Sequence, residues 1–98
     1  MAEEKYNIRC TSHAIGDYNR VLNFLQENWS VKVAANYIDK VEQKIFNLSG
    51  QPFMGIVSEK NPTIRSILLT KHNRLYYRVK NSTIELGMYL QQYKGLSN

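Results

Sequence analysis

Two amphipathic stretches separated by a very short break constrain the fold of this chain most strongly. In each stretch apolar residues recur every three or four positions, which gathers them on one face of an α-helix. The first stripe runs from Ala14 to Trp29 and the second from Ala34 to Leu48, with residues 28–30 as the break between the helices. Because so short a connection joins antiparallel neighbours, the pattern predicts a helical hairpin with facing apolar stripes.

Capping residues predict where these helices begin and end. Ser12 and Ser30 each precede an apolar stripe and carry the hydroxyl that an N-cap requires. Gly50, with Pro52 just beyond it, is typical of the end of a helix. We therefore expect the first helix to start after Ser12 and the second to run from Ser30 to Gly50.

The rest of the chain reads as strands. Tyr6–Thr11 alternates apolar and polar residues, and Gln51–Thr63, with two prolines and no periodicity, reads as a loop. Three further strands are expected at Ile64–Thr70, Leu75–Lys80 and Thr83–Leu90, joined by turns at residues 71–73 and 81–82. The predicted class is α+β with the order β-αα-βββ, an antiparallel sheet covered on one face by the helical hairpin. Ninety-eight residues suit one domain, with residues 92–98 as a flexible tail.

The excess of positive charge lies in the second half of the chain. Residues 1–49 hold six bases and six acids, whereas from residue 50 onward seven bases face two acids. Five of these bases fall within Ile64–Lys80, which contains no acid. Strand alternation places Arg74, Tyr76 and Arg78 together on the outward face. Such a face suits a polyanion or an acidic protein segment, and the alternative is an ordinary solvated strand face.

Several kinds of site find no support in the sequence. A single cysteine, Cys10, excludes an internal disulfide, and its place in a strand predicts a small buried hydrophobe. The two histidines and the scattered carboxylates lack metal-ligand spacing, and no cofactor-binding motif is present. Without a leader-like segment or a long apolar run, we expect a cytoplasmic protein.

Three short motifs add to this order of elements. An arginine opens a strand in Ile64-Arg65-Ser66-Ile67, a tyrosine pair follows in Asn73–Val79, and residues 51–55 read Gln-Pro-Phe-Met-Gly. Together with the β-αα-βββ order, they resemble the RelE/ParE superfamily of bacterial type II toxins over Tyr6 to Lys94. The resemblance implies a small growth inhibitor of a toxin–antitoxin (plasmid stabilisation) system and a cognate antitoxin whose tail wraps and neutralises it.

The resemblance implies one of two targets. RelE-like members cut mRNA, commonly at the ribosome, and carry lysines and arginines on the open sheet face with a tyrosine or histidine near the C-terminal end. Cutting RNA through the ribose 2′-hydroxyl needs a base, an acid and stabilisation of the charge at phosphorus. ParE-like members poison DNA gyrase and lack that set of residues.

The match to the ribonuclease members is partial. Arg65 and Arg74 fall where those members carry bases, and Arg74 is well placed to grip a phosphate in bidentate fashion. Ile67 stands where another lysine is often found. The residues nearest to the late catalytic positions are Tyr89, Tyr93 and Lys94.

We therefore predict a ParE-like, non-nucleolytic toxin acting on DNA gyrase. An acidic, amphipathic antitoxin segment is expected across the sheet or over the helical hairpin. The oligomeric state stays open between a monomer, a homodimer and a toxin–antitoxin hetero-oligomer. The residues expected to meet the target or the antitoxin are Arg65, Lys71, Arg74, Tyr76, Arg78, Tyr89 and Lys94, of which Arg65, Arg74, Tyr76, Arg78 and Lys94 are expected on the open face.

Two alternatives stay open, so the sequence does not decide whether the protein is an enzyme. In a ribosome-dependent mRNA endoribonuclease, Arg65 and Arg74 would hold the scissile phosphate while His72, Tyr93 or Lys94 moves protons. A histidine in a turn is more often simply solvated, and His13 has less claim still. In a non-catalytic nucleic-acid-binding module, the arginines would grip the backbone and Tyr76 would stack on bases.

Overall fold

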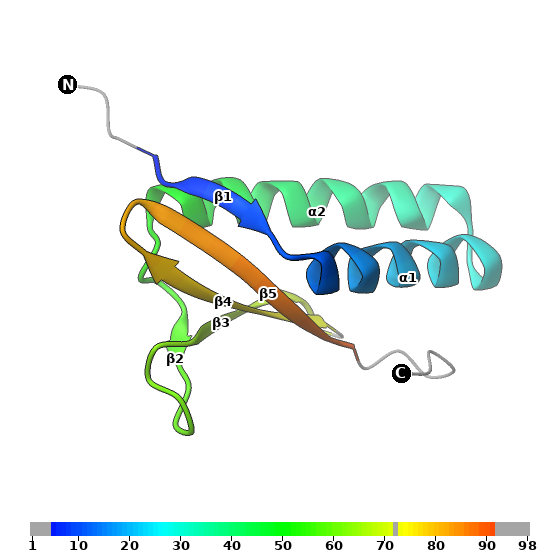
Figure 1. Cartoon of the computed structure of the whole chain (residues 1–98). Helices are drawn as coiled ribbons and strands as arrows, with labels where there is room; N and C mark the ends of the chain where they lie inside the picture. Colours follow the sequence, from blue (N-terminus) through cyan, green and yellow to red (C-terminus); the bar gives the residue numbers. More distant parts are fainter. Residues whose placement is uncertain (1–4, 72, 92–98) are drawn as a thin grey trace.

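The computed structural model describes residues 5–71 and 73–91, with side chains described up to residue 87. The helices are α1 (Ser12–Asn28) and α2 (Val31–Gly50), and the strands are β1 (Asn7–Cys10), β2 (Ile56–Val57), β3 (Arg65–Thr70), β4 (Asn73–Lys80) and β5 (Thr83–Gln91). The two helices lie side by side over one face of the sheet, and the loop that carries β2 projects away from them (Figure 1). The predicted α+β class with its helical hairpin is confirmed.

Hydroxyl caps start both helices. The Oγ of Ser30 accepts a hydrogen bond from the Val33 N–H at 3.0 Å, as predicted. The cap of α1 is Thr11 rather than Ser12: its Oγ1 accepts from the Ala14 N–H at 3.1 Å. The backbone N–H of Thr11 also donates to the Leu86 carbonyl oxygen of β5, which keeps Thr11 in an extended conformation. The helix therefore begins at the next residue, Ser12.

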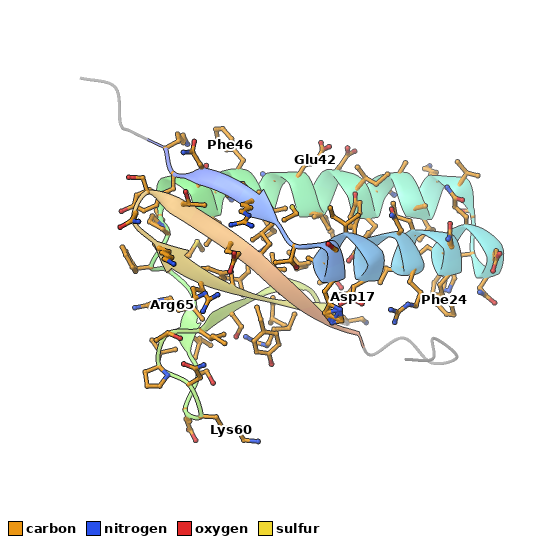
Figure 2. All side chains as sticks on the ribbon, in the orientation of Figure 1. Asp17, Phe24, Glu42, Phe46, Lys60 and Arg65 are labelled. Atoms are coloured by element: carbon orange, nitrogen blue, oxygen red, sulfur yellow. The ribbon has the colours of Figure 1, made fainter. Side chains whose placement is uncertain are left out.

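The helices bury the stripes that the sequence predicts, with two exceptions. The buried apolar residues of the helices are Ala14, Val21 and Leu25 from α1, and Ala34, Tyr37, Val41 and Leu48 from α2. Asp17 is also buried, on the side of α1 that faces the sheet, and Arg20 donates to its Oδ1 at 3.1 Å (Figure 2). Trp29 was expected in the first stripe, but it is 64% exposed. Helix α1 ends at Asn28, so Trp29 is the C-cap of α1 and lies outside the helix.

The strands form one sheet of five in the order β1-β5-β4-β3-β2. The β3-β4-β5 meander is antiparallel as predicted, and Asn81 turns the last hairpin with a φ of 56°. The sheet is mixed rather than wholly antiparallel, because β1 pairs with β5 in parallel. The helical hairpin and the meander together carry the chain back so that β5 runs alongside β1 in the same direction.

Both edges of the sheet differ from the prediction. The expected loop Gln51–Thr63 contains β2, which pairs with Arg65 and Ser66; two residues are too few to show alternation in the sequence. At the other edge, Cys10 is exposed rather than buried, since β1 has a neighbouring strand on one side only. Neither of the helices in the described residues has both the length and the apolar character needed to cross a membrane.

Candidate functional site: the open face of the sheet

Alternate residues of β4 form the centre of the sheet face that the helices leave uncovered. Leu75 and Tyr77 are fully buried on the helix side, so Arg74, Tyr76 and Arg78 point to the other side, as predicted. Arg78 is exposed, and Arg74 and Tyr76 are half-buried. We call this surface the open face; its role in binding stays a prediction.

Glu85 links two cations across this face. Its carboxylate accepts from Arg78 Nη2 at 2.9 Å and lies 3.5 Å from Arg9 Nη1. The hydrogen bond from Arg78, helped by the charge of Arg9, lowers the pKa of the Glu85 carboxyl below its ordinary value. The sequence did not indicate Arg9 here, because only the parallel pairing of β1 with β5 brings it opposite Glu85. The positive charge of Arg78 is therefore partly neutralised.

Glu85→Gln is expected to reduce the loss of stability in acid. A carboxyl with a lowered pKa in the folded state stabilises the fold above the unfolded value of 4.5, and this contribution disappears as the pH falls through the folded pKa. Urea midpoints of both proteins, measured at about pH 6 and about pH 3, check this expectation. The same fall in midpoint for both proteins would contradict a role for this carboxylate.

Arg74 is the second cation at the centre of the open face. Its Nη1 donates to the Ser66 Oγ at 2.8 Å, across the β3–β4 pair. No ion pair within the described part of the chain involves Arg74. Most of the hydrogen-bonding capacity of its guanidinium is therefore left for a partner.

A hollow of about 250 Å³ lies beside these residues. Its lining includes Tyr76, Arg78, Glu85, Gly87 and His13. A Cβ on Gly87 would meet only the Tyr76 oxygen, at an ordinary 3.7 Å, so the fold tolerates a side chain there and glycine keeps the hollow open. His13 reaches the hollow because Thr11, at the start of α1, is hydrogen bonded to Gly87. The hollow has room for one ring or side chain of a partner. The His13 imidazole beside it was not among the site residues predicted from the sequence.

Arg65 does not belong to the open face, contrary to the prediction. It pairs with Tyr77 across β3 and β4, and directly opposite residues share a face of the sheet. Its Nη1 donates to the Phe53 and Gly55 carbonyl oxygens, both at 3.0 Å, and its guanidinium lies 5.2 Å from the centre of the Phe53 ring. Figure 2 shows Arg65 beside the loop that leads into β2. Arg65 therefore stabilises a loop.

Tyr77 holds the same loop from within the core. Its hydroxyl donates to the Pro52 oxygen at 2.8 Å and accepts from the Gly55 N–H at 2.9 Å. Burial raises the pKa of Tyr77, so the hydroxyl stays protonated and able to donate. A Cβ on Gly55 would lie 2.5 Å from this hydroxyl, which explains the glycine of the Pro-Phe-Met-Gly motif. Arg65 and Tyr77, which belong to two of the short motifs described in the sequence, thus have a structural role.

The remaining predicted site residues are placed elsewhere or not described. Lys71 is exposed at the β3–β4 turn and lines a hollow with Leu25 and Lys40 of the helices, not with Arg74 and Arg78. The backbone of Tyr89 belongs to β5, but its side chain is outside the description. The candidates His72, Tyr93 and Lys94 lie outside the described residues. Within the described ranges, no three His, Cys, Asp or Glu are grouped to hold a metal ion.

Comparison with known proteins identifies the family. A model described as the ParE toxin of the type II toxin–antitoxin system, parDE, matches residues 8–87. The chain belongs to the ParE toxin family. No curated protein sequence matches this ParE-family chain.

Solved structures of related toxins share the fold at low sequence identity. The chromosomal ParDE TA system from P. aeruginosa superposes with a TM-score of 0.76 at 16% identity, over 92% of this chain and 99% of that one. The YoeB/ParE toxin from Agrobacterium tumefaciens has a TM-score of 0.64 at 22% identity, over 89% and 99% of the two chains. The YoeB dimer from Staphylococcus aureus has a TM-score of 0.64 at 16% identity, over 91% and 99%. At these identities the likeness concerns the fold.

Membership of the ParE toxin family defines the broad class of this protein. It is a toxin of the RelE/ParE superfamily, and its family implies an antitoxin partner.

Proposed function

We propose that this ParE-family protein inhibits growth by acting on DNA gyrase, without cutting RNA, and that an acidic cognate antitoxin neutralises it. The observation that supports this proposal is the separation of Arg65 from Arg74. In a ribonuclease both guanidiniums would hold one scissile phosphate, but Arg65 faces the opposite side of the sheet and donates to two loop carbonyls. This separation removes one half of the expected phosphate clamp.

The described residues of the open face also offer few groups for proton transfer. RNA cleavage needs a base near the 2′-hydroxyl and an acid near the leaving oxygen. Glu85 is held ionised by Arg78, and the Tyr77 hydroxyl is buried and hydrogen bonded on the other side of the sheet. His13 is the one described histidine beside the hollow. The surface is better suited to gripping a protein partner through Arg74, Tyr76 and Arg78.

Charge reversal of Arg74 tests the binding surface. Arg74→Glu is expected to raise the concentration of toxin that halves gyrase supercoiling at least tenfold, which corresponds to roughly 1.4 kcal/mol or more of binding free energy. The reason is that the partner loses a guanidinium that forms no ion pair with any other residue of the described chain. Lys60→Glu is the matched control: this lysine lies at the tip of the loop that projects away from the helices (Figure 2). We expect it to inhibit supercoiling like the unmodified protein.

The same assay separates the candidate targets. Purified toxin should inhibit supercoiling by gyrase and leave the mRNA of translating ribosomes intact. If mRNA is cut instead, and His13→Gln stops the cutting, the endoribonuclease alternative is correct and the hollow beside His13 is its site. If neither target is affected and expression is harmless, the nucleic-acid-binding alternative replaces both.

A further inference from the structure

The hollow on the open face contains a glycine that the fold itself does not require. Between Tyr76 and Tyr77 the pairing of β4 with β5 shifts by one residue, and this β-bulge leaves Gly87 without an opposite residue. Within 4 Å a Cβ on Gly87 would meet only the Tyr76 carbonyl oxygen, and its φ lies outside the left-handed region that favours glycine. Glycine weakens the interior of a strand, so its presence here points to a partner that approaches the backbone closely.

The hollow has the size of a single side chain. Its volume of about 250 Å³ lies below the roughly 300–1,000 Å³ that is typical of pockets for small molecules and cofactors. Ile64 and Tyr76, both half-buried, add apolar surface beside Gly87. A glycine without a side chain lets a flat ring lie close to the sheet, where the ring also contacts the Tyr76 ring. The shape of the hollow therefore favours an aromatic side chain.

The carboxylate of Glu85 favours a ring that carries a hydrogen-bond donor. This carboxylate lines the hollow and is held there by Arg78 at 2.9 Å and Arg9 at 3.5 Å. An ionised carboxylate can only accept hydrogen bonds, and its two oxygens have more lone pairs than these two contacts use. A phenol O–H or an indole N–H can donate to it, whereas the ring of phenylalanine and an aliphatic side chain cannot. Tyrosine and tryptophan are therefore the side chains that match the hollow.

Cations lie on both sides of Tyr76 along β4. Arg74 and Arg78 alternate with it on the open face, and Arg74 forms no ion pair within the described part of the chain. A segment that places a ring in the hollow passes close to these guanidiniums. Acidic residues beside the ring would pair with them, whereas basic residues there would be repelled. Charge complementarity therefore favours acidic neighbours of the aromatic residue.

We propose that the hollow receives one tyrosine or tryptophan side chain of the target, flanked by acidic residues. The ring packs beside Gly87 against Tyr76, and its polar hydrogen is donated to Glu85. The neighbouring carboxylates meet Arg74 and Arg78. Buried aromatic anchors of this kind carry a large share of the binding free energy in protein interfaces. The inference rests on the proposed function only for the identity of the target, DNA gyrase.

Synthetic pentapeptides test which side chain the hollow takes. Each peptide carries a pair of glutamates on either side of a central tyrosine, tryptophan, phenylalanine, leucine or alanine. We expect the tyrosine and tryptophan peptides to shift the amide NMR signals of Gly87 and Glu85, and to bind about ten times more tightly than the alanine peptide or better. The phenylalanine and leucine peptides are expected to bind about threefold more weakly than the tyrosine peptide or worse, because they cannot donate to Glu85.

Gly87→Val fills the hollow and leaves the fold intact. Its β-branched side chain suits a strand, and the position has space for it. The melting temperature is expected to stay unchanged or rise, whereas tyrosine-peptide binding and gyrase inhibition should both weaken about tenfold or more. Ala35→Val is the matched control, since it adds the same side chain at an exposed position of α2 on the other side of the sheet. We expect it to behave like the unmodified protein.

The outcomes decide the proposal even if Gly87→Val does not fold, because the peptide series uses the unmodified protein. Equal affinity for the tyrosine peptide and the alanine or leucine peptide would overturn it. So would unchanged peptide binding by a folded Gly87→Val, or a hollow that takes single-stranded DNA in place of the peptide and loses it in Gly87→Val.

Failure of this proposal is distinguishable from failure of the proposed function. If Gly87→Val inhibits gyrase as well as the unmodified protein, the role of the hollow is wrong and the proposed function stands. If the tyrosine peptide binds at Gly87 but the toxin does not inhibit gyrase, the target is wrong and the ligand of the hollow is right.

Discussion

Replacing Gly55 with alanine is expected to lower the free energy of unfolding by about 2–3 kcal/mol. The added Cβ would lie 2.5 Å from the Tyr77 hydroxyl oxygen and 2.9 Å from the Ser66 carbonyl oxygen. Neither neighbour moves easily, because the hydroxyl is bonded to Pro52 and the carbonyl belongs to the sheet. For a chain of this size the melting temperature should fall by about 10 °C or more. Thermal unfolding followed by circular dichroism measures it.

Gly16 provides the matched control for this prediction. It lies on the exposed side of α1, and a Cβ there would meet nothing within 4 Å. Gly16→Ala is therefore expected to raise stability by up to about 1 kcal/mol, since alanine is the better helix former. If Gly55→Ala also raised stability, the contact of Gly55 with Tyr77 would not constrain the loop.

Arg65→Ala is expected to cost about 2 kcal/mol of stability, because two charge-assisted hydrogen bonds to the loop carbonyls are lost. Partial exposure of Arg65 keeps the cost below that of two fully buried bonds. Arg65→Lys should recover only part of the loss, since an ammonium cannot hold two carbonyls with the geometry of a guanidinium. Urea unfolding of the three proteins gives the comparison.

Arg78→Ala is the control for Arg65→Ala. It removes an exposed ion pair with Glu85 and should shift the urea midpoint much less. The two possible roles of Arg65 predict different results for Arg65→Ala. If Arg65 is structural, the substitution lowers the urea midpoint. If Arg65 binds the proposed target, the substitution weakens gyrase inhibition and leaves the urea midpoint unchanged. The second result would restore the expectation that Arg65 meets the target.

Local sequence patterns predicted the helical layer because helices depend on local spacing. The stripe through Val21 and Leu25 and the one through Ala34, Val41 and Leu48 are visible without any knowledge of the sheet. The outward placement of Arg74, Tyr76 and Arg78 followed from alternation within one strand. The burial of Asp17 was not predicted, because a carboxylate within an apolar stripe can be buried only when a partner reaches it. The hydrogen bond from Arg20 is known only from the structure.

The errors about the site concern contacts between distant segments, whereas those about Trp29 and the cap of α1 are local, at the ends of one helix. Whether Arg65 shares a face with Arg74 depends on the register of β3 against β4, and the alternation within Ile64–Thr70 is too weak to fix it. The parallel β1–β5 pair, which brings Arg9 to Glu85 and His13 to the hollow, joins segments from opposite halves of the chain. The extent of the sheet at its other edge was not predictable either, because β2 is only two residues long. A sequence shows which residues alternate but not which strand ends first.

The parallel pairing of β1 with β5 has a consequence for synthesis on the ribosome. Thr11 and Gly87, which are bonded to each other, lie 76 positions apart in the chain. Strand β1 leaves the ribosome early but has no pairing partner until β5 has been synthesised. Contacts between residues so far apart in the chain slow folding. The nascent chain exposes β1 without its partner until β5 has been translated, so the open face is completed only after β5 has left the ribosome.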